Sequence, residues 1–515
     1  MGAVLLSAIS GLLLRLWILG NAPLNSDEAT AGLVAHYALH GHTSALYWGQ
    51  NYGGLEPYAA AALFVVVGQS PLALNVTPSL LALVAAILTW RIGLRVMQRG
   101  GAIAAAALTW AWAESTVWNS THERGLHEAT LVMGLIVLLE AVRIREESQK
   151  PERDSLVNWG VLGLASGLGW WSSPEIVYFL VPVSVFLVAV VIRHRFAAAT
   201  SRFMVALVGA FVGALPWLYV TVSDQVHTLS APSSPYGYGY RFRILTSHAL
   251  PMILGLRIEG AGAWVGNRFL GVVCYAVILV LSAASLVYLA FKRPEARPLV
   301  LFVCLFPFLY AAIPTTWFWN DGRYGIFLTP VLALVWMGAL WELLSGAAKW
   351  AASVILLAAL ASTLVSFNAG YQALSSWNTL TSWHSDPTTL IAGLSNELEA
   401  IGVKYVTAGY WVGNDLTFIS NDQVTAFAVG EERNPPLSAD EIAAAEREWL
   451  FPTSAGLASI ASQVGSDTVN PANLDEASFT EWLTAHRIPF RIHHLGAFDL
   501  VSPSRTVQAG AIQGT

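Results

Sequence analysis

The chain has 515 residues, of which 55% are hydrophobic and only 12% are charged, and its mean hydropathy is +0.54. This composition indicates a protein that lies mostly within a lipid bilayer and excludes an ordinary soluble enzyme. With a formal net charge of −6, the chain also lacks the basic character that nucleic-acid binding requires. We therefore expect an integral membrane protein that binds no nucleic acid.

The charges divide the chain near residue 367. Residues 1–366 carry 21 Lys and Arg against 17 Asp and Glu, whereas residues 367–515 carry 6 against 16. We predict a membrane domain over 1–366 and a soluble, acidic α/β domain over 367–515. In the second domain the patterns predict helices over 394–401 and 439–449, strands over 403–407 and 416–419, and a hairpin over 490–501.

In the first domain, about eleven apolar runs are long enough to cross roughly 30 Å of hydrocarbon. Lys and Arg cluster in every second connection, as short cytoplasmic loops do, which places the N-terminus inside and the C-terminal domain outside the cytoplasmic membrane. Cys274 and Cys304 lie within such runs and are predicted to be small buried residues. The runs are 3–20, 74–96, 101–118, 129–145, 158–172, 176–193, 203–222, 269–291, 299–315, 324–344 and 350–366.

One further apolar run, from Tyr58 to Gly68, needs a different interpretation. It has only about eleven residues, too few for a span, and counting it as one would place the basic cluster Arg91 to Arg99 outside. We expect a juxtamembrane helix within the first outer loop. The predicted fold class is therefore a mainly α, polytopic transmembrane bundle with juxtamembrane helices and a C-terminal extracytoplasmic α/β domain.

The chemically varied residues gather in the loops that this topology places outside. Asp27 and Glu28 directly follow the first span, and adjacent acids at a membrane boundary are functional-site candidates because a carboxylate near hydrocarbon is costly. The alternative is that Asp27 only caps a short helix that begins near Glu28. The other candidates are Gln50, Tyr52 and Glu56 in the same loop, His122, Glu123 and Arg124 in the second, and the late pair Arg323 and Tyr324.

These residue types suit transfer chemistry at a phosphate leaving group. An ionised acid can accept a proton or hold a metal, and an Arg fork matches phosphate oxygens. A structural alternative stays open for each group: a loop salt bridge for His122-Glu123-Arg124, an interfacial anchor for Arg323-Tyr324 and a helix-start charge for Glu56. Their shared position on one side of the membrane favours a single functional site.

With these features together, the chain resembles the C-type (GT-C) membrane glycosyltransferases. It looks closest to the branch that includes the protein O-mannosyltransferases and the bacterial aminoarabinose transferase. The resemblance covers roughly residues 1–345 and rests on the Asp-Glu pair, the juxtamembrane helix, the second-loop acid and Gly322-Arg323-Tyr324. Two stretches also look like bacterial members: Gly49-Gln-Asn-Tyr-Gly-Gly-Leu-Glu-Pro-Tyr and Leu162-Gly-Leu-Ala-Ser-Gly-Leu-Gly-Trp-Trp.

The resemblance implies an inverting transfer of a sugar from a polyprenyl-phosphate donor to a glycan, lipid or protein acceptor on the extracytoplasmic face. It implies Asp27 as general base and two further residues of the catalytic site: Glu28, which supports the loop geometry or the acceptor, and Glu123, which holds a divalent metal or orients the acceptor. The second loop reads His-Glu-Arg where the family has a lone Asp, so the use of a divalent metal, Mg²⁺ or Mn²⁺, stays open. The donor-phosphate candidates are Arg323, Tyr324 and Arg124, and the substrate-binding candidates are His122, Glu56, Gln50 and Tyr52.

Two other functions remain as alternatives. A transporter or lipid flippase commonly has ionisable residues within its spans, whereas Arg15, Glu114, Glu140 and Glu342 lie near span ends here. A polymerase or ligase of lipid-linked glycans would use an Arg-rich outer loop, and residues 223–268 hold four Arg. The concentration of acids in the outer loops favours the glycosyltransferase.

Overall fold

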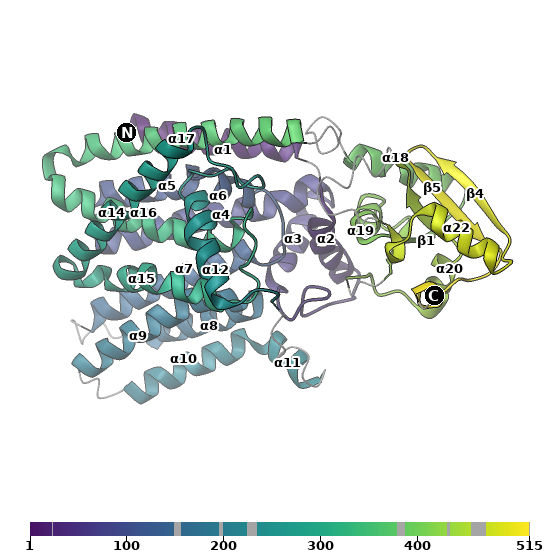
Figure 1. Cartoon of the computed structure of the whole chain (residues 1–515). Coiled ribbons are helices and arrows are strands. Elements are labelled where there is room, and N and C mark those ends of the chain that lie inside the picture. Colours follow the sequence, from purple (N-terminus) through teal and green to yellow (C-terminus); the bar gives the residue numbers. More distant parts are fainter. Residues whose placement is uncertain are drawn as a thin grey trace.

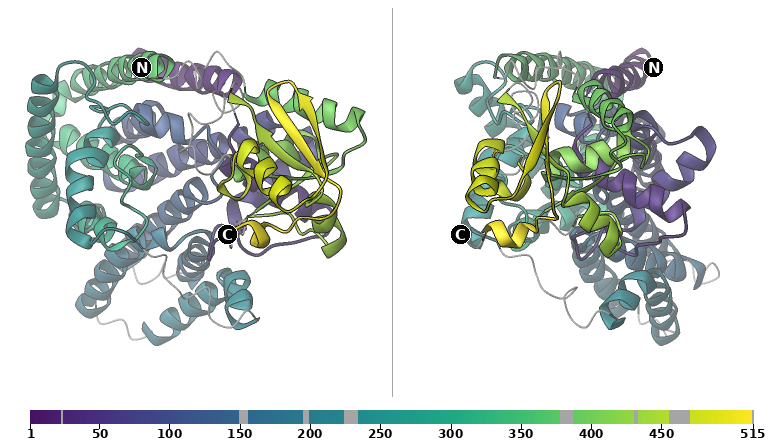
Figure 2. Two further views of the ribbon diagram at one scale, coloured as in Figure 1. Left: turned by 45° about the vertical axis from the view of Figure 1, so that its right-hand side comes forward. Right: turned by 90° about the vertical axis from the view of Figure 1, so that its right-hand side faces the viewer.

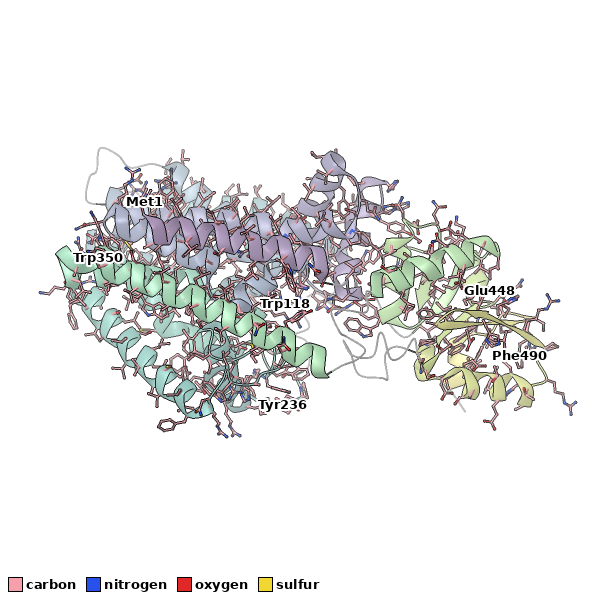
Figure 3. The ribbon with its side chains drawn as sticks, turned by 90° about the horizontal axis from the view of Figure 1, so that it is seen from above. Met1, Trp118, Tyr236, Trp350, Glu448 and Phe490 are labelled. Carbon is pink, nitrogen blue, oxygen red and sulfur yellow. The ribbon has the colours of Figure 1, made fainter. Side chains whose placement is uncertain are left out.

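The helices of the first 377 residues run roughly along one direction in a computed structural model, and a smaller α/β unit lies at one end of this bundle (Figure 1). The structure describes residues 1–22, 24–148, 156–194, 199–223, 234–377, 387–429, 433–454 and 470–513. Seen from above, Met1 and Trp350 lie at the far end of the bundle, while Glu448 and Phe490 belong to the α/β unit (Figure 3).

Every apolar run predicted as a span is mostly helical, but two runs are divided: 101–118 breaks after Ala111 into α5 and α6, and 203–222 consists of α10 and α11. By length and composition, six of the described helices could cross a membrane, or seven if the bent pair α10 and α11 is one span. The others are shorter or more charged, so the number of spans remains a prediction. The helices are α1 (Gly2–Asn21), α4 (Pro71–Val96), α5 (Arg99–Ala111), α7 (His127–Glu147), α8 (Leu156–Ser172), α9 (Val177–His194), α10 (Ala199–Gly213), α11 (Leu215–Ser223), α14 (Arg268–Lys292), α15 (Arg297–Ala312), α16 (Leu328–Leu344) and α17 (Ala348–Trp377).

The outer surface of this bundle is apolar. On α14, Phe269, Val280 and Phe291 are 74%, 67% and 80% exposed, as expected for side chains that face lipid. Cys274 and Cys304 are exposed on α14 and α15, so the prediction that both are buried is wrong. In a membrane bundle an apolar neighbourhood indicates lipid as readily as protein, and hydropathy alone does not distinguish the two.

Small residues bring α8 and α10 into close contact. A Cβ atom added at Gly163 would lie 2.0 Å from the carbonyl oxygen of Ala206, and one at Gly167 would lie 2.1 Å from that of Ala210. Within a bilayer the hydrophobic effect does not favour contact with protein over contact with lipid. Membrane helices therefore associate through close packing of their backbones at small residues. The glycine-rich run that begins at Leu162 therefore has a packing role.

Short helices cover the end of the bundle that faces the α/β unit. Helix α2 begins at Ser26 with Asn25 as its N-cap, since the Asn25 side chain accepts a hydrogen bond from the Glu28 N–H. The alternative in which Asp27 is the cap is therefore wrong. The predicted juxtamembrane helix is confirmed as α3. These short helices are α2 (Ser26–Leu39), α3 (Leu55–Val67), α6 (Glu114–Asn119), α12 (Tyr238–Ile244) and α13 (Leu250–Ile253), with short turns η2 (Pro174–Ile176), η4 (Leu245–Ala249) and η6 (Arg323–Gly325). Two further turns, η5 (Pro294–Ala296) and η7 (Ser345–Ala347), join α14 to α15 and α16 to α17.

The C-terminal unit is a five-stranded mixed sheet in the order β2-β1-β3-β5-β4. Strand β1 is parallel to β2 and β3, while β5 is antiparallel to β3 and β4. One apolar cluster joins α18 and α19 to the sheet, and another joins α22 to it. The elements are α18 (Pro387–Ala400), β1 (Tyr405–Ala408), α19 (Tyr410–Ile419), β2 (Thr425–Ala428), α20 (Ala439–Ala445), β3 (Trp449–Pro452), η9 (Pro471–Asn473), α22 (Glu476–Ala485), β4 (Phe490–Leu495), β5 (Phe498–Pro503) and α23 (Ala509–Gln513).

Most of the predicted elements here are present, and two need correction. The strand expected over 416–419 is part of helix α19, and the helix expected over 439–449 ends at Ala445, so that Trp449 begins β3. Four residues are too few for alternation to distinguish a strand from a helix that is buried on two sides. The α18 helix, the β1 strand and the β4–β5 hairpin are confirmed.

Helix α19 joins the C-terminal unit to the bundle by packing on α2, and further views show the unit lying over this end (Figure 2). Phe418 of α19 lies in one apolar cluster with Ala29 and Leu33 of α2. It approaches so closely that a Cβ at Gly32 would lie 2.4 Å from its ring. Tyr37 adds a hydrogen bond of 3.0 Å to Asp422. This junction between α2 and α19 places residues of the C-terminal unit beside Asp27.

Candidate active site

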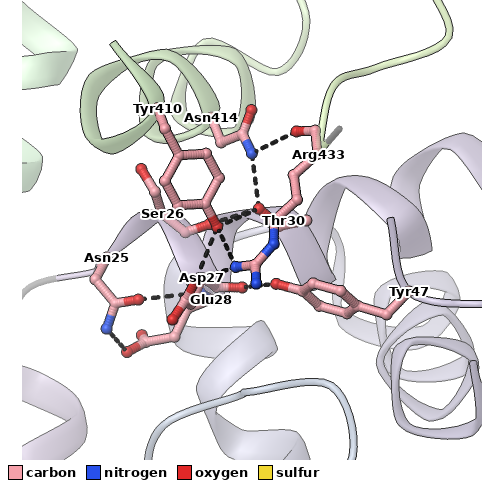
Figure 4. A network of polar contacts seen from close by, with 9 residues as sticks. All are labelled: Asn25, Ser26, Asp27, Glu28, Thr30, Tyr47, Tyr410, Asn414 and Arg433. Atoms are coloured by element: carbon pink, nitrogen blue, oxygen red, sulfur yellow. Dashed lines mark hydrogen bonds and ion pairs between the residues drawn. The ribbon is translucent and has the colours of Figure 1, made fainter. Parts of the chain in front are cut away.

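Asp27 lies at the junction between α2 and the C-terminal unit (Figure 4). Its Oδ1 atom accepts a hydrogen bond of 2.8 Å from Tyr410 Oη and forms an ion pair of 2.7 Å with Arg433 Nη1. The Tyr47 hydroxyl donates to the Asp27 carbonyl oxygen at 2.6 Å. The Asp27 side chain keeps 28% of its surface exposed, so it can still meet a substrate.

Arg433 is itself held in place. Its Nη1 atom also bonds Tyr410 Oη at 3.0 Å, and its guanidinium lies 5.7 Å and 5.5 Å from the ring centres of Tyr47 and Tyr410. Asn414 donates to the Arg433 carbonyl oxygen at 2.9 Å. Burial lowers the pKa of Arg433, but Tyr410, Tyr47 and Asp27 more than offset this and raise it above its usual value. Arg433 therefore stays a cation.

Two glycines allow Tyr47 to reach Asp27. Gly53 and Gly125 have φ values of +93° and +83°, a conformation that favours glycine. A Cβ at Gly53 would lie 2.9 Å from Tyr47 Cβ, and one at Gly125 would lie 2.5 Å from Tyr47 Cδ2. The first and second outer loops are thus packed against the two sides of this ring.

Glu28 points away from Asp27 into the protein and is completely buried. Asn75 donates to Glu28 Oε2 at 2.7 Å and accepts from the Glu123 N–H at 3.0 Å, so it links the acids of the first two outer loops. Burial raises the pKa of Glu28 to about 8, against hydrogen bonds that favour the charged form. At neutral pH Glu28 is mostly protonated.

Glu123 and Glu56 form a second buried pair. Their side chains are hydrogen-bonded to each other, the Gly125 N–H donates to Glu123 and the Ala129 N–H donates to Glu56, both at 2.8 Å. Burial raises the pKa of both groups, and for Glu123 the charge of Glu56 raises it further. Both are at most 1% exposed, so they support the loops from inside.

His122 and Gln50 differ in exposure. The His122 ring is buried, stacks on Trp118 with centroids 4.1 Å apart, and lies 2.8 Å from the Trp118 carbonyl oxygen through Nδ1. Burial, followed by the charge of Arg124, lowers the pKa of His122 to about 3, which keeps the ring neutral. Gln50 is half-buried in the first outer loop.

Arg323 and Arg124 share one anion, Asp321. Arg323 Nε lies 2.9 Å from Asp321 Oδ2, off the line of the N–H bond and thus as an ion pair, and Arg124 Nη1 lies 3.5 Å from the same oxygen. Burial alone would raise the pKa of Asp321, but the two cations hold it below its usual value. Two positive charges therefore face one negative charge, with Tyr324 buried beside them.

Tyr52 connects this group to Asp27. Burial and the nearby Tyr324 and Glu175 raise the pKa of Tyr52, while Arg323 and Arg433 lower it, so both arginines lie close enough to act on this ring. The charge of Asp27 likewise helps to raise the pKa of Arg323, behind the larger effects of burial, Asp321 and Tyr324. The candidate base and the candidate phosphate ligand belong to one electrostatic environment.

Four contributors to this arrangement were missed in the sequence: Asn75, Asp321, Tyr410 and Arg433. Asp321 stands two residues before Arg323, a spacing that could have identified it as a counter-ion. Arg433 and Tyr410 lie more than 380 positions from Asp27, and no local pattern marks them. Their role depends on how the C-terminal unit packs on α2.

The carboxylates do not form a ligand set for a metal ion. Among the described residues no group of three or more His, Cys, Asp or Glu side chains is arranged to hold one. Glu28 and Glu123 are occupied by amide donors, and Asp27 by Arg433 and Tyr410. The residues present do not fit a divalent cation.

Comparison with solved structures identifies the fold. ArnT from Cupriavidus metallidurans bound to undecaprenyl phosphate matches with a TM-score of 0.61, 11% sequence identity and coverage of 98% of both chains. The chain has the GT-C fold. The apo form of the same ArnT, an aminoarabinose transferase, matches this GT-C fold with a TM-score of 0.59, 11% identity and the same coverage. No protein-family profile matches the sequence, and no curated protein matches it.

Proposed function

We propose that this protein is a membrane glycosyltransferase that moves a sugar from a polyprenyl-phosphate donor to an acceptor on the extracytoplasmic face. The proposal rests on one observation: within a GT-C fold, the charge of an accessible carboxylate, Asp27, acts on Arg323, which shares its counter-ion Asp321 with Arg124. ArnT, which has the same fold, was solved with undecaprenyl phosphate bound.

The positive group suits the leaving phosphate. Among the ion pairs of the described residues, Arg323 and Arg124 share one acid, Asp321, and the protonated state of the nearby Glu28 adds no negative charge at neutral pH. A lipid phosphate that departs from the anomeric carbon gains negative charge, and preorganised cations stabilise that charge without reorganisation. No acid is then needed to protonate the leaving group.

Asp27 supplies the base. As the acceptor hydroxyl attacks the anomeric carbon, Asp27 takes its proton and the bond to the lipid phosphate breaks on the opposite face. This single displacement inverts the anomeric configuration. The 28% exposure of the Asp27 side chain allows contact with an acceptor, whereas the completely buried Glu28 supports α2 from behind.

The test is mass analysis of lipids and surface glycans in cells with and without the protein. We expect one sugar-bearing product to disappear and its polyprenyl-phosphate sugar to accumulate in cells that lack the protein. Asp27→Asn should fail to restore the product, since an amide cannot take the proton. Asp440→Asn, which changes an exposed acid on α20, serves as the control and should restore it fully.

Full restoration by Asp27→Asn would overturn the base mechanism. Unchanged glycans together with an altered distribution of a lipid between the two leaflets would instead indicate a transporter. Membrane insertion and a normal melting temperature of Asp27→Asn should be checked, so that a loss of product reports on chemistry.

A further inference from the structure

We propose that Arg433 and Tyr410, both from the C-terminal unit, are positioning residues for Asp27: they hold its Oδ1 atom and leave Oδ2 to take the proton. This inference rests on the proposed function, in which Asp27 is the general base. It makes the C-terminal unit a part of the active site.

The geometry distinguishes the two carboxylate oxygens. Oδ1 accepts from Tyr410 Oη at 2.8 Å and from Arg433 Nη1 at 2.7 Å, while Oδ2 has no bond to any residue in the described parts of the chain. Two donors on one oxygen fix the rotation of a carboxylate about its last bond. The second oxygen then points in a constant direction, as a base that meets one particular hydroxyl requires.

The two donors are themselves fixed. Tyr410 Oη lies 3.3 Å from Thr30 Oγ1, and Asn414 ties this Thr30 hydroxyl to the Arg433 carbonyl oxygen with bonds of 2.7 Å and 2.9 Å. Figure 4 shows this network as a closed set between α2 and α19. Because every member is bonded to another, the position of Oδ1 depends on the docking of α19.

Arg433 contributes a charge as well as a hydrogen bond. Its Nη1 atom forms an ion pair of 2.7 Å with Asp27 Oδ1, and a charge-assisted bond of this kind holds an oxygen more firmly than a neutral one.

A purely structural role is the alternative, in which these contacts only dock the C-terminal unit. The junction contains a matched control: Tyr37 of α2 donates to Asp422 of the C-terminal unit at 3.0 Å, and this bond does not touch Asp27. Tyr37→Phe and Tyr410→Phe each remove one hydroxyl from the same junction. Only Tyr410→Phe removes a donor from Asp27 Oδ1.

The experiment measures initial transfer rates of the purified full-length protein. The substrate is the membrane fraction of cells that lack the protein, which supplies both donor and acceptor, and the product is measured by mass spectrometry. We expect Tyr410→Phe and Arg433→Ala to lower the rate by about ten- to a hundredfold, the usual effect of a misplaced catalytic group, and Tyr37→Phe to change it less than about twofold.

Melting temperatures separate positioning from docking. Tyr410→Phe and Tyr37→Phe each remove one hydroxyl from the same junction, so we expect similar melting temperatures for the two variants but a loss of rate in Tyr410→Phe alone. Arg433→Lys should restore part of the rate that Arg433→Ala loses, since it keeps the charge but lacks the planar fork.

Rates for Tyr410→Phe and Arg433→Ala equal to that of Tyr37→Phe would overturn the positioning role. If Arg433→Ala does not fold, Tyr410→Phe decides, because it removes a single oxygen. The two proposals fail in different ways. If Asp27→Asn is inactive while Tyr410→Phe and Arg433→Ala are fully active, only the positioning role is refuted. If Asp27→Asn is active, the role of Asp27 as base is refuted.

Discussion

Arg323 illustrates how closely the fold holds a single charged side chain. It is 17% exposed, lies 5.5 Å and 5.0 Å from the ring centres of Phe318 and Tyr324, and shares Asp321 with Arg124. The interfacial-anchor alternative would place the guanidinium in the headgroup region instead. The observed contacts favour a guanidinium that is fixed in place and shares its counter-ion, Asp321, with Arg124.

At this scale we predict that Arg323→Ala weakens the binding of undecaprenyl phosphate, used as the probe, far more than Arg323→Lys does. A charge-assisted contact with phosphate is worth roughly 1.5–3 kcal/mol, and lysine keeps the charge while losing the fork. Binding can be measured by thermal shift in detergent against lipid concentration. Arg243→Ala, at an exposed position of α12, should bind like the wild type. Equal losses in the Ala and Lys variants would indicate a packing role.

Among the elements, α8 and α10 show what composition can and cannot reveal. The positions of the membrane helices followed from hydropathy, because each buries or exposes a long apolar stretch whatever its neighbours are. The identity of the partner helix did not follow, since contact between Gly167 and the Ala210 backbone is a property of two distant segments. The same limit explains the error at α19. Apolar and polar residues alternate from Leu416 to Phe418 as in a strand, but residues 416–419 form part of a helix that is buried against both α2 and the sheet.

For this element pair we predict that Gly167→Ala lowers the melting temperature. The added methyl would lie 2.1 Å from a backbone oxygen that cannot move without separating the two helices, and such overpacking costs on the order of 1–3 kcal/mol. Gly20→Ala on α1, where nothing lies within 4 Å, should leave the melting temperature unchanged or slightly raised. A normal melting temperature for Gly167→Ala would show that α10 moves away freely.

The whole molecule should lose stability as the pH rises from about 6.5 to about 8. Burial raises the pKa of Glu28 from about 4.5 to about 8, so the folded state holds a proton that the unfolded state releases between these values. The contribution of Glu28 is therefore greatest below this window, falls through it and is level above it. Glu56 and Glu123, whose pKa values are also raised by burial, act in the same direction. His122, whose pKa burial lowers from 6.5 to about 3, acts in the opposite direction below about pH 6.5.

Melting temperatures measured from pH 4.5 to 9 test this expectation. Glu28→Gln should flatten the decline, because its neutral amide does not titrate. Between the two ends of the range, the free energy of unfolding of the variant should fall less than that of the wild type, by on the order of a few kcal/mol. Glu481→Gln, at an exposed position of α22, should keep the wild-type slope. Parallel slopes for wild type and Glu28→Gln would mean that Glu28 is ionised in the folded protein.

As with the fold, one part of the candidate site could be predicted from the sequence and another part could not. Asp27, Arg323 and Arg124 lie outside the predicted spans and on one side of them, and that local signal is present in the sequence. Glu28 and Glu123 are linked through Asn75 of α4, and the partners of Asp27 depend on the docking of a separate unit. No window of neighbouring residues contains such information, because it arises only when the chain is folded.

The bond between Asp27 and Arg433 joins residues that are 406 positions apart. If these contacts position Asp27 as proposed, we expect the three positions 27, 410 and 433 to change together rather than one at a time. A chimera that takes its C-terminal unit from another protein of this fold should therefore be active only when it keeps compatible residues at all three positions.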